Sequence, residues 1–274
     1  MLLSLKTKNI TMKKTTIVGF AMAAILASCT QPEAPTSHAG VYSLDKVIWN
    51  YDGKDNESSA ADGTTQFKIY TAESYFYIIE NKDSAVSFGV GSYTQKDANN
   101  MEEVNIFNTT TLDSAATVKL AITKNEKGYN QKIDAIVING KKWSSSEDYT
   151  KLESAGTSDL DGVWHQTKSI NVTGQDSVVN TYNEYKVYHA GHFMWAARAA
   201  ADATSNTFAN TVGKGSFTLS NGALTEDLTF CSNKIWVGKY NIPVTFNGPD
   251  EFTQTISDTV NKVTSIKTYK RVSK

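Results

Sequence analysis

Apolar and polar residues alternate along most of the chain that follows Gly40. Segments 224–230 and 240–246 show this well, because apolar residues take every second position and mostly polar residues take the others. Such alternation is typical of a β-strand with one buried face, whereas a helix would repeat about every 3.6 residues. Turn-forming sequences such as 81–83 and 220–222 separate the alternating segments. The pattern therefore predicts an all-β protein.

The same pattern occurs twice. Six short blocks recur in the same order, at offsets that range from 118 (67 to 185) to 124 (89 to 213). One pair is Gly40-Val41-Tyr42 and Gly162-Val163-Trp164, and gaps fall only between blocks, where loops are expected. Conserved order over six blocks indicates a duplicated unit of one structural domain.

Each unit contains about eight strand-like segments. Eight consecutive antiparallel strands can close into an up-and-down barrel, which leaves no exposed sheet edge. We therefore predict two tandem eight-stranded barrels, with a pair of β-sandwiches as the alternative. The Ala-rich segment 198–209 is the best candidate for a helix or lid. In the first unit the segments are 40–49, 65–71, 74–80, 86–94, 102–108, 117–124, 129–138 and 146–152.

The start of the chain is typical of a targeting signal. Lys13 and Lys14 precede an apolar run, 17–26, that is too short to span a bilayer, which needs about 20 apolar residues. The run ends in Leu26-Ala27-Ser28-Cys29, which resembles the lipobox of bacterial lipoproteins, where the cysteine is acylated and becomes the new N-terminus. An ordinary signal cleaved near Ala27 is the alternative.

These observations divide the chain into five parts. Segment 1–28 is predicted to be a lipoprotein signal peptide, and 29–39 a lipidated tether that is polar and contains prolines. Segment 40–153 is the first barrel, 154–160 a linker and 161–274 the second barrel.

Composition excludes several classes of function. The chain has 27 basic and 28 acidic residues, so it lacks the basic excess that binding to nucleic acid requires. Two cysteines are too few for a disulfide scaffold or a cysteine-based zinc module. No Gly-x-Ser-x-Gly nucleophile elbow is present. We therefore expect no catalytic residues, no metal, no cofactor and no enzyme activity.

Four residues carry a resemblance to a known family. The second unit opens with Gly162-Val163-Trp164 and has Arg271 on its last strand. This resembles the lipocalin (calycin) pattern, in which an arginine packs over the tryptophan of a Gly-x-Trp strand and closes one end of the barrel. Tyr42 and Lys151 take these positions in the first unit. A cation over an aromatic face contributes about 0.5–2 kcal/mol.

The units are also similar to lipocalin-like domains of Bacteroidetes lipoproteins of unassigned function. The shared motifs appear here as Phe67-Lys68-Ile69-Tyr70, Tyr75-Phe76-Tyr77, Gly91-Ser92-Tyr93 and Thr225-Glu226. The resemblance covers 40–153 and 161–273. It implies a lipocalin-like fold and a place in the cell envelope, and lipocalins generally hold small apolar ligands inside the barrel.

Two glutamates are candidate ligand anchors. Glu226 shares strand parity with Leu224 and Leu228, and Glu102 shares parity with Val104 and Ile106, so we expect both carboxylates to point into a barrel. A carboxylate there costs several kcal/mol unless it is paired, hydrogen-bonded or protonated. Each glutamate is therefore either an anchor for a ligand headgroup or a structural group satisfied by tyrosine hydroxyls or strand-end amides.

Aromatic residues complete the candidate ligand site. Phe193 and Trp195 share one strand face in the second unit, and Tyr77 matches Trp195 in the first. Aromatic side chains at a period of two form either core or a ligand platform. Two histidines, His189 and His192, flank a predicted hairpin in the second unit, but no third ligand has a fitting spacing, so polar turn residues are the better interpretation.

Two functions remain open. The first is a non-enzymatic, membrane-anchored lipocalin-like lipoprotein that binds a small apolar or amphiphilic ligand inside a barrel. The second is a structural or accessory lipoprotein with filled barrels that contacts another envelope protein. Because Thr30 is not the aspartate that retains enterobacterial lipoproteins at the inner membrane, we expect the lipid anchor to lie in the outer membrane.

Overall fold

The computed structural model describes residues 37–81, 86–109, 117–138, 140–199 and 210–272. The predicted signal peptide, Cys29, most of the tether and most of the Ala-rich segment lie outside these residues. Residues Pro35–Lys274 form one compact unit that contains both halves of the repeat. Within the described part of the chain, no helix is both long and apolar enough to cross a membrane.

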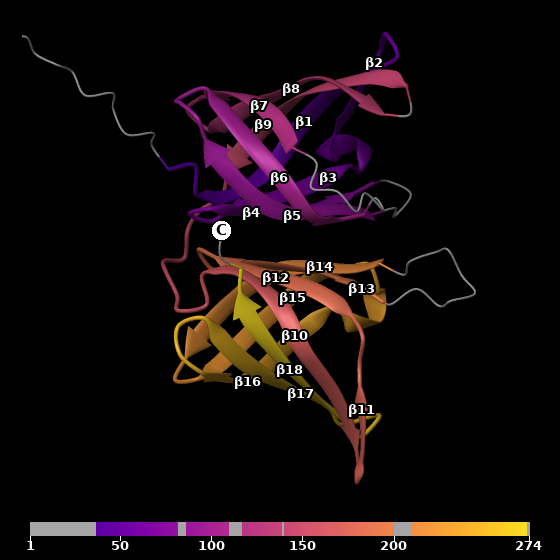
Figure 1. The fold of residues 1–274 in the computed structure, drawn as a ribbon, viewed down its shortest axis with the longest axis vertical. Coiled ribbons are helices and arrows are strands. Elements are labelled where there is room, and N and C mark those ends of the chain that lie inside the picture. Colours follow the sequence, from indigo (N-terminus) through magenta and orange to yellow (C-terminus); the bar gives the residue numbers. More distant parts are fainter. Residues whose placement is uncertain (1–36, 82–85, 110–116, 139, 200–209, 273–274) are drawn as a thin grey trace, which may run out of the picture. The chain divides into compact units, whose positions relative to one another are not determined.

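The first half folds into a closed antiparallel barrel, barrel 1. Its strands follow the order β2-β1-β3-β4-β5-β6-β7-β8-β9, and β1 also pairs with β9, so β1 and β3–β9 close an eight-stranded cylinder (Figure 1). The bounds are β1 Gly40–Tyr51, β2 Lys54–Ser59, β3 Thr65–Tyr70, β4 Ser74–Glu80, β5 Val86–Gln95, β6 Asn100–Asn108, β7 Thr117–Lys124, β8 Gly128–Ile138 and β9 Lys141–Lys151.

The second half repeats this topology as barrel 2. The order is β11-β10-β12-β13-β14-β15-β16-β17-β18, and β10 pairs with β18 to close the cylinder. The bounds are β10 Gly162–Thr173, β11 Asp176–Val179, β12 Asn183–His189, β13 His192–Arg198, β14 Asn210–Ser220, β15 Ala223–Cys231, β16 Gly238–Phe246, β17 Glu251–Asp258 and β18 Val263–Arg271. Two short 3-10 helices, η1 Ala60–Asp62 and η2 Lys234–Trp236, complete the described elements.

The predicted fold class is confirmed: the protein is all-β, with two closed eight-stranded antiparallel barrels in tandem. The β-sandwich alternative is wrong, since the first and last strands of each half are hydrogen-bonded. Strand β2 was not predicted, because its six residues are all polar and carry no hydrophobic alternation.

Both barrels bend at matching places. The β5–β6 ladder shifts register between Val90 and Gly91, and the β14–β15 ladder shifts between Lys214 and Gly215. A Cβ atom built on Gly91 would collide with the carbonyl oxygen of Val104, so a side chain at this position would push the strands apart. Glycine here permits the close backbone approach that a bulge requires.

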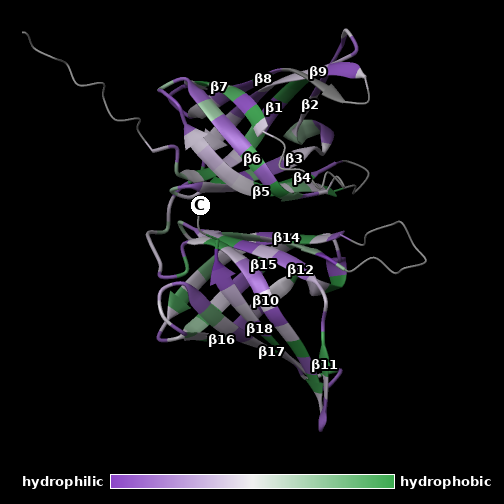
Figure 2. Cartoon of the chain, viewed as in Figure 1, coloured by the Kyte–Doolittle hydropathy of each residue, from purple (hydrophilic) through white to green (hydrophobic). Residues whose placement is uncertain are grey.

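Alternation along the strands produces three apolar clusters, and hydrophobic and hydrophilic residues are interleaved on the ribbons (Figure 2). One cluster fills barrel 1 and one fills barrel 2. The third, the inter-barrel cluster, joins outer-face side chains of both barrels, as in the 5.0 Å ring contact of Phe107 and Tyr185. Its buried members are Val41, Ile69, Phe76, Ile78, Phe88, Val90, Phe107, Val163, Val187, Ala190, Met194, Ala196, Val212 and Phe230.

Candidate functional site

A buried polar network crosses the interior of barrel 2. The Lys186 ammonium on β12 lies 3.0 Å from Glu226 Oε1 on β15 and 3.3 Å from Gln254 Oε1 on β17. The Tyr188 hydroxyl donates to the same Glu226 oxygen at 2.5 Å. All four side chains are buried. The predicted anchor Glu226 therefore points inward, and an ammonium and a phenol already occupy its carboxylate.

Barrel 1 contains the matching network. The Lys68 ammonium on β3 lies 2.7 Å from Glu103 Oε1 on β6 and donates to Gln131 Oε1 on β8 at 3.2 Å. The Tyr70 hydroxyl donates to Glu103. Each of these residues stands 118 to 123 positions before its counterpart in barrel 2 (68 to 186, 103 to 226).

A second interior carboxylate differs between the barrels. In barrel 2, Glu184 accepts hydrogen bonds from Lys267 at 2.7 Å and from Tyr269 at 2.6 Å. In barrel 1 the carboxylate is Glu147, and it accepts from the Ser145 and Tyr149 hydroxyls at 2.8 and 2.5 Å.

Among the residues that the structure describes, the donors to Glu147 are all neutral, because the third is the Gln131 amide at 3.1 Å. Strand register equates Glu147 with Lys267 and Gln66 with Glu184. The carboxylate has thus moved to a different strand, and the second lysine is missing.

Formal charge inside the two barrels consequently differs. Among the described residues, the interior of barrel 1 holds one lysine and two glutamates, whereas that of barrel 2 holds two lysines and two glutamates. Burial opposes ionisation of Glu184, but the charges of Lys267 and Lys186 outweigh it and hold the pKa of Glu184 below its usual range.

Burial, and then the neighbouring carboxylates, raise the pKa of Tyr70, Tyr149, Tyr188 and Tyr269 well above the usual value for tyrosine. These phenols are consequently fixed hydrogen-bond donors at neutral pH.

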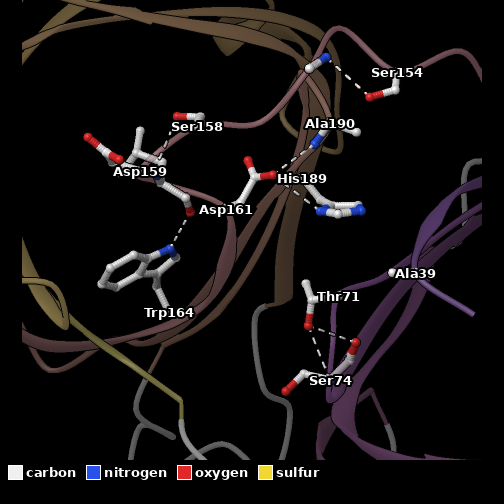
Figure 3. Close-up of polar contacts among 12 residues, drawn as sticks. Ala39, Thr71, Ser74, Ser154, Ser158, Asp159, Asp161, Trp164, His189 and Ala190 are labelled. Carbon is white, nitrogen blue, oxygen red and sulfur yellow. Dashed lines mark hydrogen bonds and ion pairs between the residues drawn. The ribbon is translucent and has the colours of Figure 1, made fainter. Parts of the chain in front are cut away.

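The closed end of barrel 2 contains the predicted cation–aromatic pair. The Arg271 guanidinium lies 4.1 Å from the centre of the Trp164 ring. It also donates to the carbonyl oxygens of Asp161 at 2.5 Å and Pro249 at 3.0 Å. The Trp164 indole donates to the Leu160 carbonyl at 2.8 Å, the contact drawn as a dashed line from Trp164 in Figure 3. Together these contacts fix the loop before β10 beneath the barrel.

The closed end of barrel 1 has a looser version of this cation–aromatic contact. The Lys151 ammonium lies 5.9 Å from the Tyr42 ring, whose hydroxyl donates to the His38 carbonyl at 3.1 Å. His38 takes the place of Leu160, and its imidazole is buried against Tyr70 and Tyr129, with ring centroids 4.7 and 4.5 Å away. Burial, with the charges of nearby lysines, lowers the pKa of His38 to about 3.

The inward direction expected for Glu102 is wrong. Glu102 lies on the outer face of β6 and pairs with Lys96 at 2.8 Å, and its neighbour Glu103 is the buried carboxylate. Ile106, which shares parity with Glu102, is 48% exposed, and the buried Met101 marks the inner face instead. The repeat offset at this strand is 123, which makes Glu103, and not Glu102, the counterpart of Glu226.

The predicted aromatic residues do lie on inner faces. Phe193 is buried inside barrel 2, and Trp195 is partly buried with its ring 6.2 Å from that of Trp236. Tyr77 stacks on Tyr75 at 6.3 Å in barrel 1. A Cβ atom on Gly213 would overlap the Trp195 ring, and one on the matching Gly89 would overlap Tyr77. Glycine on the neighbouring strand thus makes room for each large ring.

The two histidines of the β12–β13 hairpin have separate partners. His189 Nδ1 lies 3.4 Å from the Asp161 carboxylate (Figure 3), and the His192 ring hydrogen-bonds to the Glu153 carbonyl at 3.3 Å. Over the described ranges, no group of three or more His, Cys, Asp or Glu side chains is placed to hold a metal ion.

Sequence reasoning missed the lysines, although a signal for them existed. Lys68 and Tyr70 stand two positions apart in the repeated Phe-Lys-x-Tyr motif, as do Lys186 and Tyr188, so each lysine shares a strand face with a tyrosine. If the tyrosine is buried, the lysine must be buried as well. Recurrence of both residues in the two units would have supported an interior ion pair.

Comparison with known proteins adds little to this geometry. No protein-family model matches the sequence, and no curated protein matches it. Two solved structures that resemble this chain are mutant forms of the vaccine antigen transferrin binding protein B from Haemophilus parasuis Hp5, and their sequences are 8% and 10% identical to it. The matches cover 89% of this chain and 78% and 77% of those chains, with TM-scores of 0.24 and 0.25. At such TM-scores the likeness carries no argument, and the architecture rests on strand register alone.

Proposed function

We propose that this chain is a non-enzymatic, lipid-anchored protein of the bacterial cell envelope whose barrels are filled scaffolds, so that it acts through contacts of its outer surface with another envelope protein. The lipocalin-like motifs described above and the lipobox-like segment that ends at Cys29 support this proposal.

The observation that carries the proposal is the occupancy of both barrel interiors. An eight-stranded barrel is just wide enough to be filled by side chains or to hold one small ligand. Here Lys68 and Lys186 each span their barrel to a carboxylate and an amide on strands across it. A ligand headgroup would have to break one of these buried ion pairs, which is costly.

The place where the tether enters the fold supports a short anchor. His38 is buried at the closed end of barrel 1, nine positions after Cys29. Fully extended, nine residues span about 30 Å. If Cys29 is acylated, barrel 1 is held within that distance of the membrane surface.

The filled interior is tested with a neutral apolar fluorophore, N-phenyl-1-naphthylamine, titrated into the mature protein. We expect no saturable fluorescence increase that depends on Trp195. A saturable increase that Trp195→Ala abolishes would contradict the filled-barrel proposal. Anchoring is tested separately by labelling cells with radioactive palmitate: label should enter the wild-type chain and not Cys29→Ala.

A second candidate function is ligand binding at the open end of barrel 2. It is favoured by Trp195, which is only partly buried, and by the neighbouring Trp236, which is 44% exposed. In this case a long-chain alcohol would change the tryptophan fluorescence of the wild-type protein and leave that of Trp195→Ala unchanged.

A further inference from the structure

One residue of the inter-barrel surface breaks the repeat. Lys214 on β14 pairs with Met194, as Val90 on β5 pairs with Phe76, and both residues immediately precede the bulge in their strand. Val90 is fully buried in the inter-barrel cluster. Barrel 2 therefore carries a lysine at a position that its counterpart fills with a buried aliphatic side chain.

The Lys214 ammonium lies among aromatic rings. It is 3.8 Å from the centre of the Phe67 ring of barrel 1 and 5.4 Å from that of Phe230. Among the described residues it has no hydrogen-bond or ion-pair partner. Burial lowers the pKa of Lys214 to about 8, against a smaller opposing effect of Glu80. A cation–aromatic contact compensates only part of the desolvation of an ammonium.

A cavity adjoins this ammonium. It has a volume of about 530 Å³ and is lined by residues of both barrels, including the apolar side chains of Phe67, Ile69, Leu152, Met194 and Phe230. Its volume lies within the usual range of small-molecule sites, about 300–1,000 Å³. Mostly apolar walls with a few convergent polar groups, here Lys214 and Glu80, are also typical of such sites.

The charged groups around the cavity leave an excess of positive charge. Glu80 lines the cavity, but its carboxylate is 3.6 Å from the Lys234 ammonium. His192 lines it too, with its ring turned to the Glu153 carbonyl. Lys214 and Lys234 therefore carry together one more positive charge than Glu80, which acts on both, can balance.

We propose that this cavity binds a small anionic amphiphile, with its carboxylate on Lys214 and its hydrocarbon chain against the apolar side chains of the inter-barrel cluster. Such a ligand would supply the missing negative charge and cover apolar surface at the same time. The site lies outside both barrel interiors and does not depend on the filled-barrel proposal or on a protein partner.

The test is calorimetric titration of the mature chain with dodecanoate below its micelle concentration. We expect saturable binding with one site per chain. Loss of the charge-assisted hydrogen bond in Lys214→Val should weaken dodecanoate binding by about tenfold or more. This substitution installs the residue found at the matching position of barrel 1, so the fold is expected to tolerate it.

Three controls distinguish binding at Lys214 from nonspecific uptake of an amphiphile. Lys239→Val removes an exposed lysine of the same barrel and should leave the affinity unchanged. Dodecanol and dodecyltrimethylammonium should bind at least about tenfold more weakly than dodecanoate, because neither offers an anion. Dodecanoate should also raise the pKa of Lys214, followed by NMR of the ¹³C-dimethylated amine.

Absence of saturable binding, or equal affinity in Lys214→Val, would overturn the proposal. Equal affinity for dodecanol would do so as well, since the lysine would then contribute no recognition. If Trp195→Ala weakens dodecanoate binding and Lys214→Val does not, the ligand lies inside barrel 2, and both this inference and the filled-barrel proposal are wrong.

Discussion

Barrels 1 and 2 share topology, bulge positions and a central Lys–Glu–Gln–Tyr network, yet they differ at three matched places. Among the described residues, the interior of barrel 1 contains one lysine and two glutamates, and the interior of barrel 2 contains two lysines and two glutamates. The closed end is Tyr-Lys-His in barrel 1 and Trp-Arg-Leu in barrel 2. On the outer face, Val90 in barrel 1 corresponds to Lys214 in barrel 2.

The difference between the two interiors shows that the hydrogen bond from tyrosine to a carboxylate is retained more strictly than the charge around it. Tyr149 and Tyr269 occupy the same position, and each donates to a carboxylate, although the carboxylate comes from β9 in one barrel and from β12 in the other. A buried acceptor can be satisfied by neutral donors or by a cation, so either solution fills the barrel.

The largest expected effect comes from removing the interior lysine. Lys68→Met leaves two buried glutamates in barrel 1 without any cation, and should lower the free energy of unfolding by about 3–5 kcal/mol. Lys186→Met should cost less, because Lys267 remains. Urea unfolding measures the difference, and Lys96→Met, at the surface, is the control. Equal losses in the two barrels would show that their charge difference is unimportant.

The second largest effect is expected on acidification, which should destabilise barrel 1 more than barrel 2. The pKa of His38 is about 3 in the folded chain and 6.5 in its unperturbed form, so between these values the unfolded state binds a proton that the folded state does not. Stability attributable to neutral His38 is therefore present above pH 6.5 and is lost as pH falls, by about 3 kcal/mol between pH 7 and pH 4.

Hydrogen exchange read by mass spectrometry at pH 7 and pH 4 resolves this effect strand by strand. Protection in β1 and β3 should fall more than protection in β10 and β12. His38→Leu, which copies Leu160, should remove the extra loss in barrel 1, and Leu160→His should create one in barrel 2. An unchanged acid response in His38→Leu would contradict the assignment.

A moderate effect is expected at the closed ends. Arg271→Lys removes hydrogen bonds to the Asp161 and Pro249 carbonyls, and should lower the free energy of unfolding by about 1–2 kcal/mol. The reverse change, Lys151→Arg, should have a smaller effect, since Tyr42 offers a smaller ring. Thermal unfolding of both variants tests this, and a loss for Lys151→Arg as large as that for Arg271→Lys would contradict it.

The smallest effect concerns the outer face. Lys214→Val replaces a desolvated ammonium by an aliphatic side chain within an apolar cluster, and should raise the free energy of unfolding by about 1 kcal/mol in the absence of ligand. Lys239→Val should be close to neutral. Chemical unfolding measured with and without dodecanoate distinguishes the contributions, because ligand binding stabilises only the variant that retains the site.

Much of the fold could be predicted because strand alternation is local in sequence and the repeat is visible when the two halves are compared. Alternation alone did not reveal the interior lysines, since a charged residue in an alternating segment is ordinarily assigned to the solvent face; only their recurrence on the strand face of a tyrosine in both units indicates burial. The error at Glu102 has a different cause: Val104 and Ile106, the apolar residues that share its parity, lie on the outer face of this strand, and a difference of one residue reverses the face of a side chain.

The sequence does contain a sign of the inter-barrel cluster, which is a continuous apolar segment rather than an alternating one. In 75–79 every residue is apolar or aromatic, which is typical of a strand covered on both faces. Such a strand needs a second partner, but the sequence does not say which surface provides it. The environment of Lys214 was therefore beyond sequence reasoning.

The transfer of a carboxylate from β12 to β9 has a consequence for misassembly during folding. Tandem repeats of one chain can exchange equivalent strands. If β12 replaced β3 in barrel 1, Glu184 would join Glu147 beside the same phenol, and two carboxylates would compete for it. If β18 replaced β9, Lys267 would lie beside Gln66, which cannot form an ion pair with it. The mismatch penalises hybrid cylinders and so helps each half to select its own strands.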